Sequence, residues 1–301
     1  MPVLIVITGP TGSGKTALAV DVAVRLGCHV ISADSRQIYR GIPITTAAPD
    51  KAQLAAAPHH FIAEKNLDEY YSAAEFENDV MTLLPALWRD SDYAVMCGGS
   101  MMYVDAVLYG IDELPTVSEQ VRREAYGILE REGTAGVIAR LRRLDPDYLA
   151  SADLNNHKRL VHALEVSVQA GVPYSSLCTG RRKQRYFRIL KVAIDRPRED
   201  LFARINVRVD MMVEQGMERE ARSVSHLRHL NSLNTVGFKE MFAYFDGVMD
   251  RDTAINRIKK NTRVYAKKQL TWLKRSDDTV WLAPDAGADD VIRLISGSSV
   301  Q

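Results

Sequence analysis

The residues best suited to chemistry form a glycine-rich run near the N-terminus. Gly9-Pro10-Thr11-Gly12-Ser13-Gly14-Lys15-Thr16 matches the phosphate-loop pattern G-x-x-x-x-G-K-[ST] at every fixed position. Glycines in such a loop let backbone N–H groups turn toward an anion, and the helix that follows adds the partial positive charge of its N-terminus. Lys15 can reach phosphate oxygens, and the Thr16 hydroxyl can ligate Mg²⁺. The segment predicts a site for a diphosphate or a triphosphate.

A second group of polar residues follows the second expected strand, at His29–Ser32. Asp34 lies just beyond the carboxyl end of that strand. Because ligands of open parallel sheets bind at this edge, we expect Asp34 to face the phosphate loop, where it can accept a proton. Arg204 and Arg208 stand at i and i+4 of a predicted helix, hence on one face, and either can balance phosphate charge. The plainer alternatives are a capping aspartate and two solvated surface arginines.

These residues need a sheet that brings the loop and Asp34 to one edge. Short apolar runs bounded by turn residues alternate with segments of helical periodicity, which is typical of parallel βαβ units. The chain is therefore expected to have an α/β fold, with a P-loop NTPase-like parallel sheet core. The expected elements are strands at Val3–Thr8, His29–Ser32 and Tyr93–Cys97, a helix at Lys15–Leu26 ended by Gly27, and a helix opened by the capping box Ser72-Ala73-Ala74-Glu75.

The pattern changes from about Glu113, where helical segments follow one another as far as Cys178. Gly133, Pro146 and Gly171 are the expected breaks between them. We therefore expect residues 113–184 to form an all-helical domain inserted into a core made of residues 1–112 and 185–301. The core is expected to resume with a strand near 187–194, a long helix after Pro197 and a short strand near 280–282.

Composition is that of an ordinary globular protein, with 46% hydrophobic and 26% charged residues in a chain of 301. No apolar run approaches the roughly 18 residues that span a bilayer, and Val3–Ile7 is too short for the core of a signal peptide. Three scattered cysteines indicate neither a disulfide framework nor a metal site. We expect a cytoplasmic protein without membrane contact, most simply a monomer, with structural roles for His59, His60, His226 and His229.

A formal net charge of +1 conceals two basic stretches. Residues 251–275 contain nine Lys or Arg and a single acid, and residues 181–191 contain six basic residues and no acid. A charged stretch is usually a solvated helix face. The concentration of base in the C-terminal half nevertheless favours a phosphate-rich partner such as a nucleic acid.

Most proteins with this phosphate loop transfer or hydrolyse the γ-phosphate of a nucleotide. The chain lacks an N-K-x-D guanine motif, a strand ending in D-x-x-G, and an apolar strand ending in Asp-Glu. These absences weaken the ATPase and GTPase interpretations.

Beyond the loop, Asp34-Ser35-Arg36-Gln37-Ile38-Tyr39-Arg40-Gly41 resembles the D-S-x-Q-x-Y-x-G segment of tRNA dimethylallyltransferases. Six further blocks resemble the same family in the same order, so the resemblance covers nearly the whole chain. Ser100 replaces a usual Thr but keeps its hydroxyl, and the cysteine pattern of the eukaryotic zinc-finger extension is missing. The blocks are Pro58-His59-His60, Tyr71 to Phe76, Gly98 to Tyr103, Arg159 to Val166, Val236 to Glu240, and Thr262 to Leu273.

The resemblance implies transfer of a dimethylallyl group from dimethylallyl diphosphate to N6 of the adenosine at tRNA position 37, beside the anticodon. It implies that Asp34 is the general base, and that Lys15, Thr16 with Mg²⁺, and Arg204 in preference to Arg208 stabilise the leaving diphosphate. The adenine must leave its stack to react, and Gln37 is suited to pair with its edge. Tyr265 and Trp272 are expected in the core. The implied contacts with the tRNA anticodon stem-loop are Asp34, Ser35, Arg36, Gln37, Ser100, Arg122, Lys158, Arg159, Leu160, Val161, His162, Arg263, Lys267 and Lys268.

Three alternatives remain at this point. A phosphate-loop small-molecule kinase explains Gly9–Thr16 but leaves the basic helix without a role. An adenylate prenyltransferase that acts on free nucleotides shares much of the motif set, and strong tRNA binding would separate it from the preferred interpretation. In an ATP-gated RNA-binding module, Asp34 would be dispensable.

Overall fold

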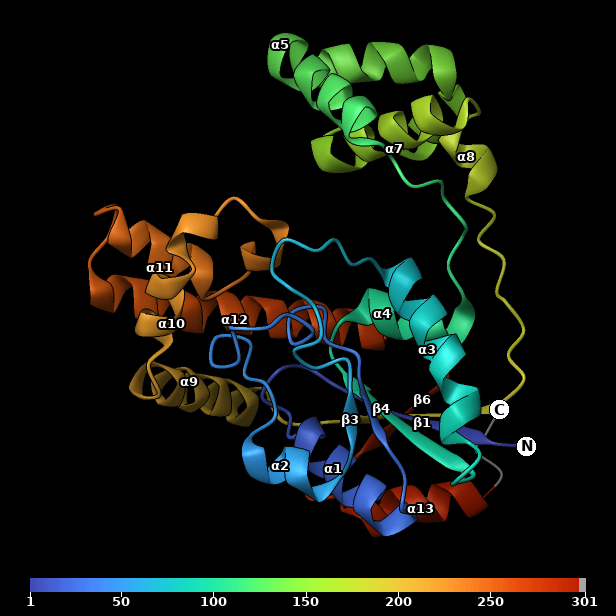
Figure 1. Ribbon diagram of the computed structural model, residues 1–301, viewed down its shortest axis with the longest axis vertical. Coiled ribbons are helices and arrows are strands. Elements are labelled where there is room, and N and C mark those ends of the chain that lie inside the picture. The colour runs from blue at the N-terminus through green and yellow to red at the C-terminus, as the bar shows by residue number, and fades with distance from the viewer. Residues whose placement is uncertain (298–301) are drawn as a thin grey trace. The chain divides into compact units, whose positions relative to one another are not determined.

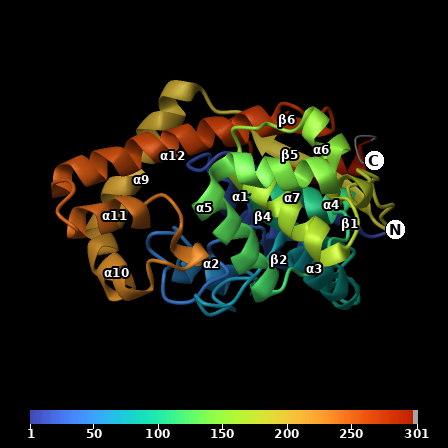
Figure 2. The same ribbon diagram turned by 90° about the horizontal axis from the view of Figure 1, so that it is seen from above.

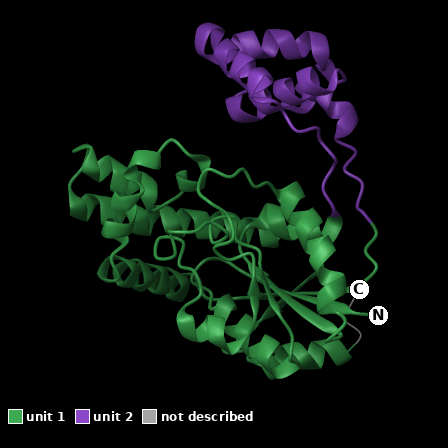
Figure 3. Cartoon of the chain, in the orientation of Figure 1, with its two compact units in different colours: residues 1–109, 184–301 green, residues 110–183 purple. Residues whose placement is uncertain are grey.

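The computed structural model describes residues 1–297, and the chain forms two compact units (Figure 3). The first joins Met1–Tyr109 to the segment that begins at Gln184, and the second is Gly110–Lys183. The observed boundaries differ from those expected for the helical insertion only by a few residues. Within residues 1–297, no helix combines the length and apolar character needed to cross a membrane.

A six-stranded sheet forms the centre of the first unit, with all neighbouring strands parallel and in the order β3-β2-β4-β1-β5-β6 (Figure 1). The expected α/β fold with a parallel sheet is confirmed. The two-residue β3 was not expected, because so short a strand leaves no periodic signal. The strands are β1 Val3–Thr8, β2 Val30–Ser32, β3 His59–His60, β4 Tyr93–Gly98, β5 Arg188–Ile194 and β6 Thr279–Leu282.

Two hydrophobic cores cover the two faces of the sheet, because successive side chains of a strand point to opposite faces. In β1, Leu4 and Val6 belong to the core packed by α3 (Ala73–Leu87) and α4 (Met101–Tyr109). Val3, Ile5 and Ile7 belong to the other core. That second core is covered by α1 (Lys15–Leu26) and α13 (Ala288–Ser296), which contact each other.

Local signals placed several helix ends correctly. Gly27 adopts the left-handed conformation at the end of α1, and Ser72 and Glu75 form the predicted reciprocal capping box at the start of α3. The longest helix of this unit, α12 (Arg251–Leu273), packs against α9 (Arg198–Glu214) and α11 (Phe238–Phe245) (Figure 2). The shorter helices α2 (Lys51–Ala56) and α10 (Met217–Ser223) complete it, with 3₁₀ turns at Ser225–Leu227 and Asn231–Leu233.

The second unit contains only helices, and the three predicted breaks are confirmed. Gly133 interrupts α5 with a φ of 65°, Pro146 starts α6, and Gly171 ends α7 in the left-handed conformation. Asp145 is fully buried; it caps α6 through Tyr148 N and also accepts hydrogen bonds from Ser175. The helices are α5 Glu119–Leu144, α6 Pro146–Ser151, α7 His157–Ala170 and α8 Tyr174–Leu177.

Candidate active site

The phosphate loop connects β1 to α1. Three of its glycines have positive φ angles that other residues rarely adopt: 149° at Gly9, 83° at Gly12 and 101° at Gly14. Gly14 is also the N-cap of α1, so the first amides of that helix open toward the loop. The backbone therefore has the concave form that binds phosphate groups through N–H donors.

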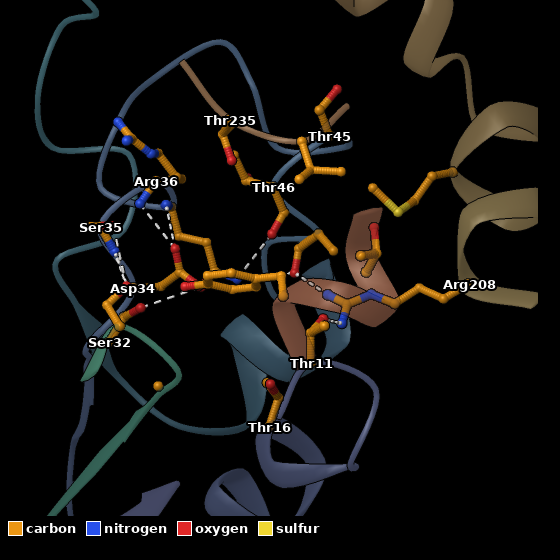
Figure 4. Close-up of a pocket in the computed structure, with 18 of the residues that line it drawn as sticks. Thr11, Thr16, Ser32, Asp34, Ser35, Arg36, Thr45, Thr46, Arg208 and Thr235 are labelled. Carbon is orange, nitrogen blue, oxygen red and sulfur yellow. Dashed lines mark hydrogen bonds between the residues drawn. The ribbon is translucent and has the colours of Figure 1, made fainter. Parts of the chain in front are cut away.

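A pocket of about 390 Å³ opens beside this loop (Figure 4). Its wall includes Thr11, Lys15 and Thr16 from the loop and α1, the turn after β2, and residues of α9 and α12. In Figure 4, Asp34 and Arg208 project into it from opposite sides. The predicted site residues that line it are Thr11, Lys15, Thr16, Asp34, Ser35, Arg36, Gln37, Ser100 and Arg208. The other predicted residues of the described chain lie outside its lining.

Asp34 is held by its own backbone turn. Its Oδ1 accepts hydrogen bonds from the amides of Arg36 and Gln37, at 2.9 and 3.3 Å. Within residues 1–297, its Oδ2 accepts no hydrogen bond, and the residue lines the pocket. Ser100 supports the same turn, since its Oγ accepts a 2.8 Å hydrogen bond from Ser35 N. This arrangement is suited to accepting a proton.

The side-chain amide of Gln37 was expected to be free to pair with a base, but in the structure it forms hydrogen bonds within the protein. Its Nε2 donates to the carbonyl oxygens of Thr46 and Ala47, at 3.2 and 3.0 Å. Its Oε1 accepts from Ser32 Oγ at 3.2 Å. Because both amide hydrogens are used, Gln37 holds the turn at Thr46 and Ala47, where Ala47 has a φ of 48°. In this structure Gln37 shapes the pocket and has no donor left for a base.

Arg36 also forms hydrogen bonds within the protein, through one of its guanidinium nitrogens. Its Nη1 donates to Asn231 O at 2.8 Å and to Ser232 O at 3.3 Å. The guanidinium thus ties the turn that carries Asp34 to the segment before α11, from which Asn234, Thr235 and Lys239 line the pocket. Sequence reasoning assigned no role to these last three residues, although Lys239 lies within the Val236–Glu240 block and Asn234 and Thr235 directly precede it.

The two candidate arginines of α9 have different positions. Arg208 lines the pocket, and its Nη1 donates to Thr11 Oγ1 at 2.9 Å while its Nη2 reaches Ala47 O at 3.3 Å. Arg204 is exposed and does not line the pocket, and its Nε donates to Gly12 O of the loop at 3.0 Å. The structure therefore favours Arg208 over Arg204 as the arginine that faces a ligand.

Lys15 is the other cation at the loop. Its Nζ lies 3.4 Å from Pro10 O and lines the pocket. Removal from water lowers the pKa of Lys15, and neighbouring Arg208 lowers it further, although Asp34 and Cys97 act in the opposite direction. Burial also lowers the pKa of Arg208. Two poorly solvated cations therefore share one pocket, an arrangement that an anionic ligand stabilises.

Tyr265 corrects a prediction, because it lies at the pocket surface and not in the core. It is 40% exposed and lines the pocket. Desolvation and then the charge of Asp34 raise its pKa. Four residues of α12 line the pocket: Ile258, Thr262, Tyr265 and Gln269. Their spacing of four, three and four residues predicts that they share one face of the helix, and this could have been seen in the sequence. Trp272 is half-buried, and its Nε1 donates to Asp105 at 2.8 Å.

The basic stretches are only partly available to a partner. On α12, Arg251 pairs with Glu218 and Lys259 with Asp210, whereas Lys267 and Lys268 are exposed. Arg263 donates to Asn206 and, like Lys267, lies near the ring of Phe202. In the 181–191 stretch, the buried Arg185 and Lys191 pair with Glu77 and Asp278. Because the side chains of Arg185 and Lys191 are buried in ion pairs, fewer cations of this stretch can contact phosphate groups than its composition suggested.

In the second unit, the structure divides the predicted RNA contacts into two groups. Lys158, Arg159, His162 and Arg122 are exposed, and Arg122 Nε lies 3.7 Å from the buried Glu165. Leu160 and Val161 are 0% and 1% exposed and pack in the unit's hydrophobic core. The prediction is therefore wrong for the side chains of Leu160 and Val161, which solvent does not reach.

Comparisons with known proteins show what the whole chain is similar to. The model of the family "IPP transferase" matches residues 37–276. A protein of Porphyromonas gingivalis named "tRNA dimethylallyltransferase 2" is 50% identical over 293 residues, covering 97% of this chain and 98% of that protein. A protein of Bacteroides thetaiotaomicron named "tRNA dimethylallyltransferase 1" is 48% identical over 285 residues, covering 95% and 92%.

Two solved structures share the fold. The tRNA isopentenylpyrophosphate transferase of Bacillus halodurans has a TM-score of 0.70 and 32% identity, covering 98% of this chain and 94% of that one. A eukaryotic dimethylallyltransferase described as acting on tRNA has a TM-score of 0.82 and 25% identity, covering 98% and 79%. The match of the family model to most of the chain, and the identity to relatives along nearly all of it, show that this chain belongs to the IPP transferase family.

Proposed function

We propose that the protein transfers a dimethylallyl group from dimethylallyl diphosphate to N6 of adenosine 37 in tRNA, giving N6-dimethylallyladenosine. One observation carries the proposal within this family: Asp34, with Oδ2 unbonded in the described chain, shares a pocket with the phosphate loop. A proton acceptor and a diphosphate cradle on one cavity are what alkylation of an amine by a prenyl diphosphate requires. The names of the relatives supply the acceptor, tRNA.

In the proposed reaction, the lone pair of adenine N6 forms a bond to C1 of the prenyl group. The C1–O bond breaks, and its electron pair leaves with the diphosphate. Asp34 Oδ2 takes the proton that N6 loses as it becomes positive. Because Oδ1 is fixed by two backbone amides, the carboxylate is oriented before the substrate arrives.

Negative charge grows on the diphosphate as the bond breaks, and preorganised cations lower the barrier where this charge develops. Lys15 and Arg208, which line the pocket, would take that role, and Arg204 would hold the loop through its hydrogen bond to Gly12 O. The Thr16 hydroxyl, which lines the pocket, would hold Mg²⁺. Within residues 1–297, no three His, Cys, Asp or Glu side chains converge as a metal site. Mg²⁺ would neutralise the leaving diphosphate.

The tRNA would bind through the anticodon stem-loop, with the adenine turned out of its stack into the pocket. Exposed cations of both units, including Arg122, Lys158, Arg159, Lys267 and Lys268, would contact its phosphates. His162 and Arg263 are further candidates, while Ser100 would act beside Ser35 at the pocket. A cytoplasmic monomer is part of the proposal, and size-exclusion chromatography with light scattering tests the monomer.

The direct experiment incubates the protein with dimethylallyl diphosphate, Mg²⁺ and total tRNA, digests the RNA and measures nucleoside masses. Prenyl-adenosine in the digest supports the proposal. Equimolar AMP replaces tRNA in a parallel reaction, and a product formed only from AMP would identify an adenylate prenyltransferase instead. Stoichiometric phosphate release from ATP during turnover would indicate a kinase or ATPase.

A further inference from the structure

Gln269 makes a contact that the proposed chemistry does not explain. It is 3% exposed, and its side chain comes from α12 into the junction between two loops. Its Oε1 accepts a 2.9 Å hydrogen bond from Thr11 N in the phosphate loop. Its Nε2 donates at 2.8 Å to Gly99 O, in the turn that follows β4. One carboxamide therefore joins segments that are far apart in the sequence.

Close packing makes this bridge specific. A Cβ atom built on Gly99 would stand 2.4 Å from Gln269 Nε2, a distance that no real contact tolerates. Gly98 is more tightly confined, since its Cβ would lie 2.1 Å from the backbone oxygen of Ala33, whereas the Gln269 amide could move if it gave up its hydrogen bonds. The two glycines let the turn fit between the strand that leads to Asp34 and the amide of Gln269. A longer or shorter side chain at 269 cannot make both hydrogen bonds.

Each end of the bridge continues into one half of the pocket. On the phosphate side, Thr11 also accepts a hydrogen bond from Arg208. On the other side, Gly99 precedes Ser100, whose Oγ accepts the amide of Ser35 beside Asp34. The side chain of Gln269 thus stands between the group that holds the leaving diphosphate and the group that holds the base.

We propose that Gln269 is a positioning residue that sets the spacing between the phosphate loop and the turn carrying Asp34. This inference rests on the proposed function, in which donor and base must meet at one adenine nitrogen. It requires an acceptor facing Thr11 N and a donor facing Gly99 O. A carboxamide supplies both, a carboxylate supplies only acceptors, and a protonated carboxyl group again supplies both.

The different hydrogen-bonding capacities of these groups give a test that distinguishes a hydrogen-bonding role of Gln269 from a packing role. Calorimetric binding of inorganic diphosphate with Mg²⁺ is measured for the parent, Gln269→Glu and Gln269→Met at several pH values. At neutral pH we expect Gln269→Glu to bind diphosphate about tenfold more weakly than the parent, because the carboxylate keeps the hydrogen bond from Thr11 N but loses the one to Gly99 O. Toward acid pH the difference in diphosphate affinity between Gln269→Glu and the parent should shrink. Burial raises the pKa of the introduced carboxyl group, and its protonation restores a hydrogen-bond donor to Gly99 O. Gln269→Met should show a deficit that does not change with pH.

A second perturbation approaches the bridge from its other end. Gly99→Ala should also weaken diphosphate binding, whereas adding Gly99→Ala to Gln269→Ala should cost almost nothing further, because the clashing amide is gone. Trp272→Phe is the matched control, since it removes a hydrogen bond between α12 and Asp105 without touching either loop. The diphosphate affinity of Trp272→Phe should stay within about twofold of the parent. The changes at 99 and 269, which remove groups in direct contact, should instead be non-additive.

Single-turnover rates with saturating tRNA and prenyl donor complete the test. Gln269→Glu should lower the saturated rate, with partial recovery at acid pH relative to the parent, while tRNA affinity is unchanged. The inference would be overturned if Gln269→Glu and Gln269→Met lost the same diphosphate affinity at every pH. It would also be overturned if the losses caused by the changes at 99 and 269 were additive. Failure of the parent to form prenyl-adenosine would overturn the proposed function instead, and diphosphate binding would still report on Gln269.

Discussion

The pocket and the cationic surface of this protein hold their polar groups in opposite ways. Around the pocket, Asp34, Gln37 and Arg208 each make hydrogen bonds to backbone or loop atoms that fix their direction. On the exposed surfaces of α12 and of the second unit, Lys268 and Lys158 project into solvent. Fixed groups lower a reaction barrier because they need no reorganisation, whereas solvated cations add affinity through counterion release.

The difference indicates where single substitutions should matter. Removing a fixed group in the pocket should change the reaction rate or donor affinity by orders of magnitude. Removing one surface cation should change RNA affinity a little and the salt dependence measurably.

The largest effect is expected from Asp34→Asn. Asparagine can still accept the amide hydrogen bonds of Arg36 and Gln37, so the turn should persist and both substrates should bind. The amide has no basic oxygen, and a positioned general base contributes roughly 10²–10⁴-fold to a rate. Single-turnover rates with both substrates saturating measure this loss free of binding effects.

Asp50→Asn is the matched control, because Asp50 Oδ1 also accepts a hydrogen bond from a backbone amide, at the start of α2, and Asp50 does not line the pocket. Its saturated rate should equal that of the parent. A rate for Asp34→Asn within about tenfold of the parent would be too small a loss for a positioned base, and the proton would then leave to water or to the diphosphate.

The next effect separates the two arginines of α9. Arg208→Ala should weaken binding of Mg²⁺-diphosphate by about 10–100-fold, as for a hydrogen bond to a charged group. Arg204→Ala should weaken this binding by less than about threefold, since Arg204 is exposed and does not line the pocket. Calorimetric titration of both variants tests the order, and a larger loss for Arg204→Ala would reverse the assignment made from the pocket geometry.

A smaller effect on tRNA affinity is expected from the exposed lysines of α12. Changing Lys267 and Lys268 together to Ala should reduce the slope of log tRNA affinity against log salt by about 1–2 units. Donor affinity should stay the same. Arg25→Ala with Arg293→Ala is the control pair, on α1 and α13, and should leave the slope intact. An unchanged slope in the Lys267 and Lys268 variant would show that this part of α12 does not contact RNA.

The smallest effect concerns pH. Because desolvation lowers the pKa of Lys15, its ammonium loses its proton at a lower pH than an ordinary lysine does. Affinity for diphosphate should therefore fall as pH rises through that lowered pKa, and be restored at lower pH. Lys15→Arg keeps its charge, so the ratio of its affinity to that of the parent should increase with pH. A constant ratio in calorimetric titrations would mean that Lys15 stays protonated throughout.

Local interactions made much of this protein predictable from its sequence. The phosphate loop, the capping box at Ser72 and the helix breaks at Gly133, Pro146 and Gly171 depend on neighbouring residues, and the structure has each where it was expected. The alternation of strands and helices was enough to indicate a parallel sheet.

Tertiary structure decided which side chains reach the pocket. Arg204 and Arg208 share one face of α9, so spacing cannot distinguish them, and only the packing of α9 against the loop turned Arg208 inward. Leu160 and Val161 adjoin exposed cations in sequence, yet the helical repeat directs them into the core. Gln269 meets Thr11 across 258 positions of chain, a contact that no local pattern encodes. Periodicity determines which residues share a face, but only the packed neighbours determine what that face touches.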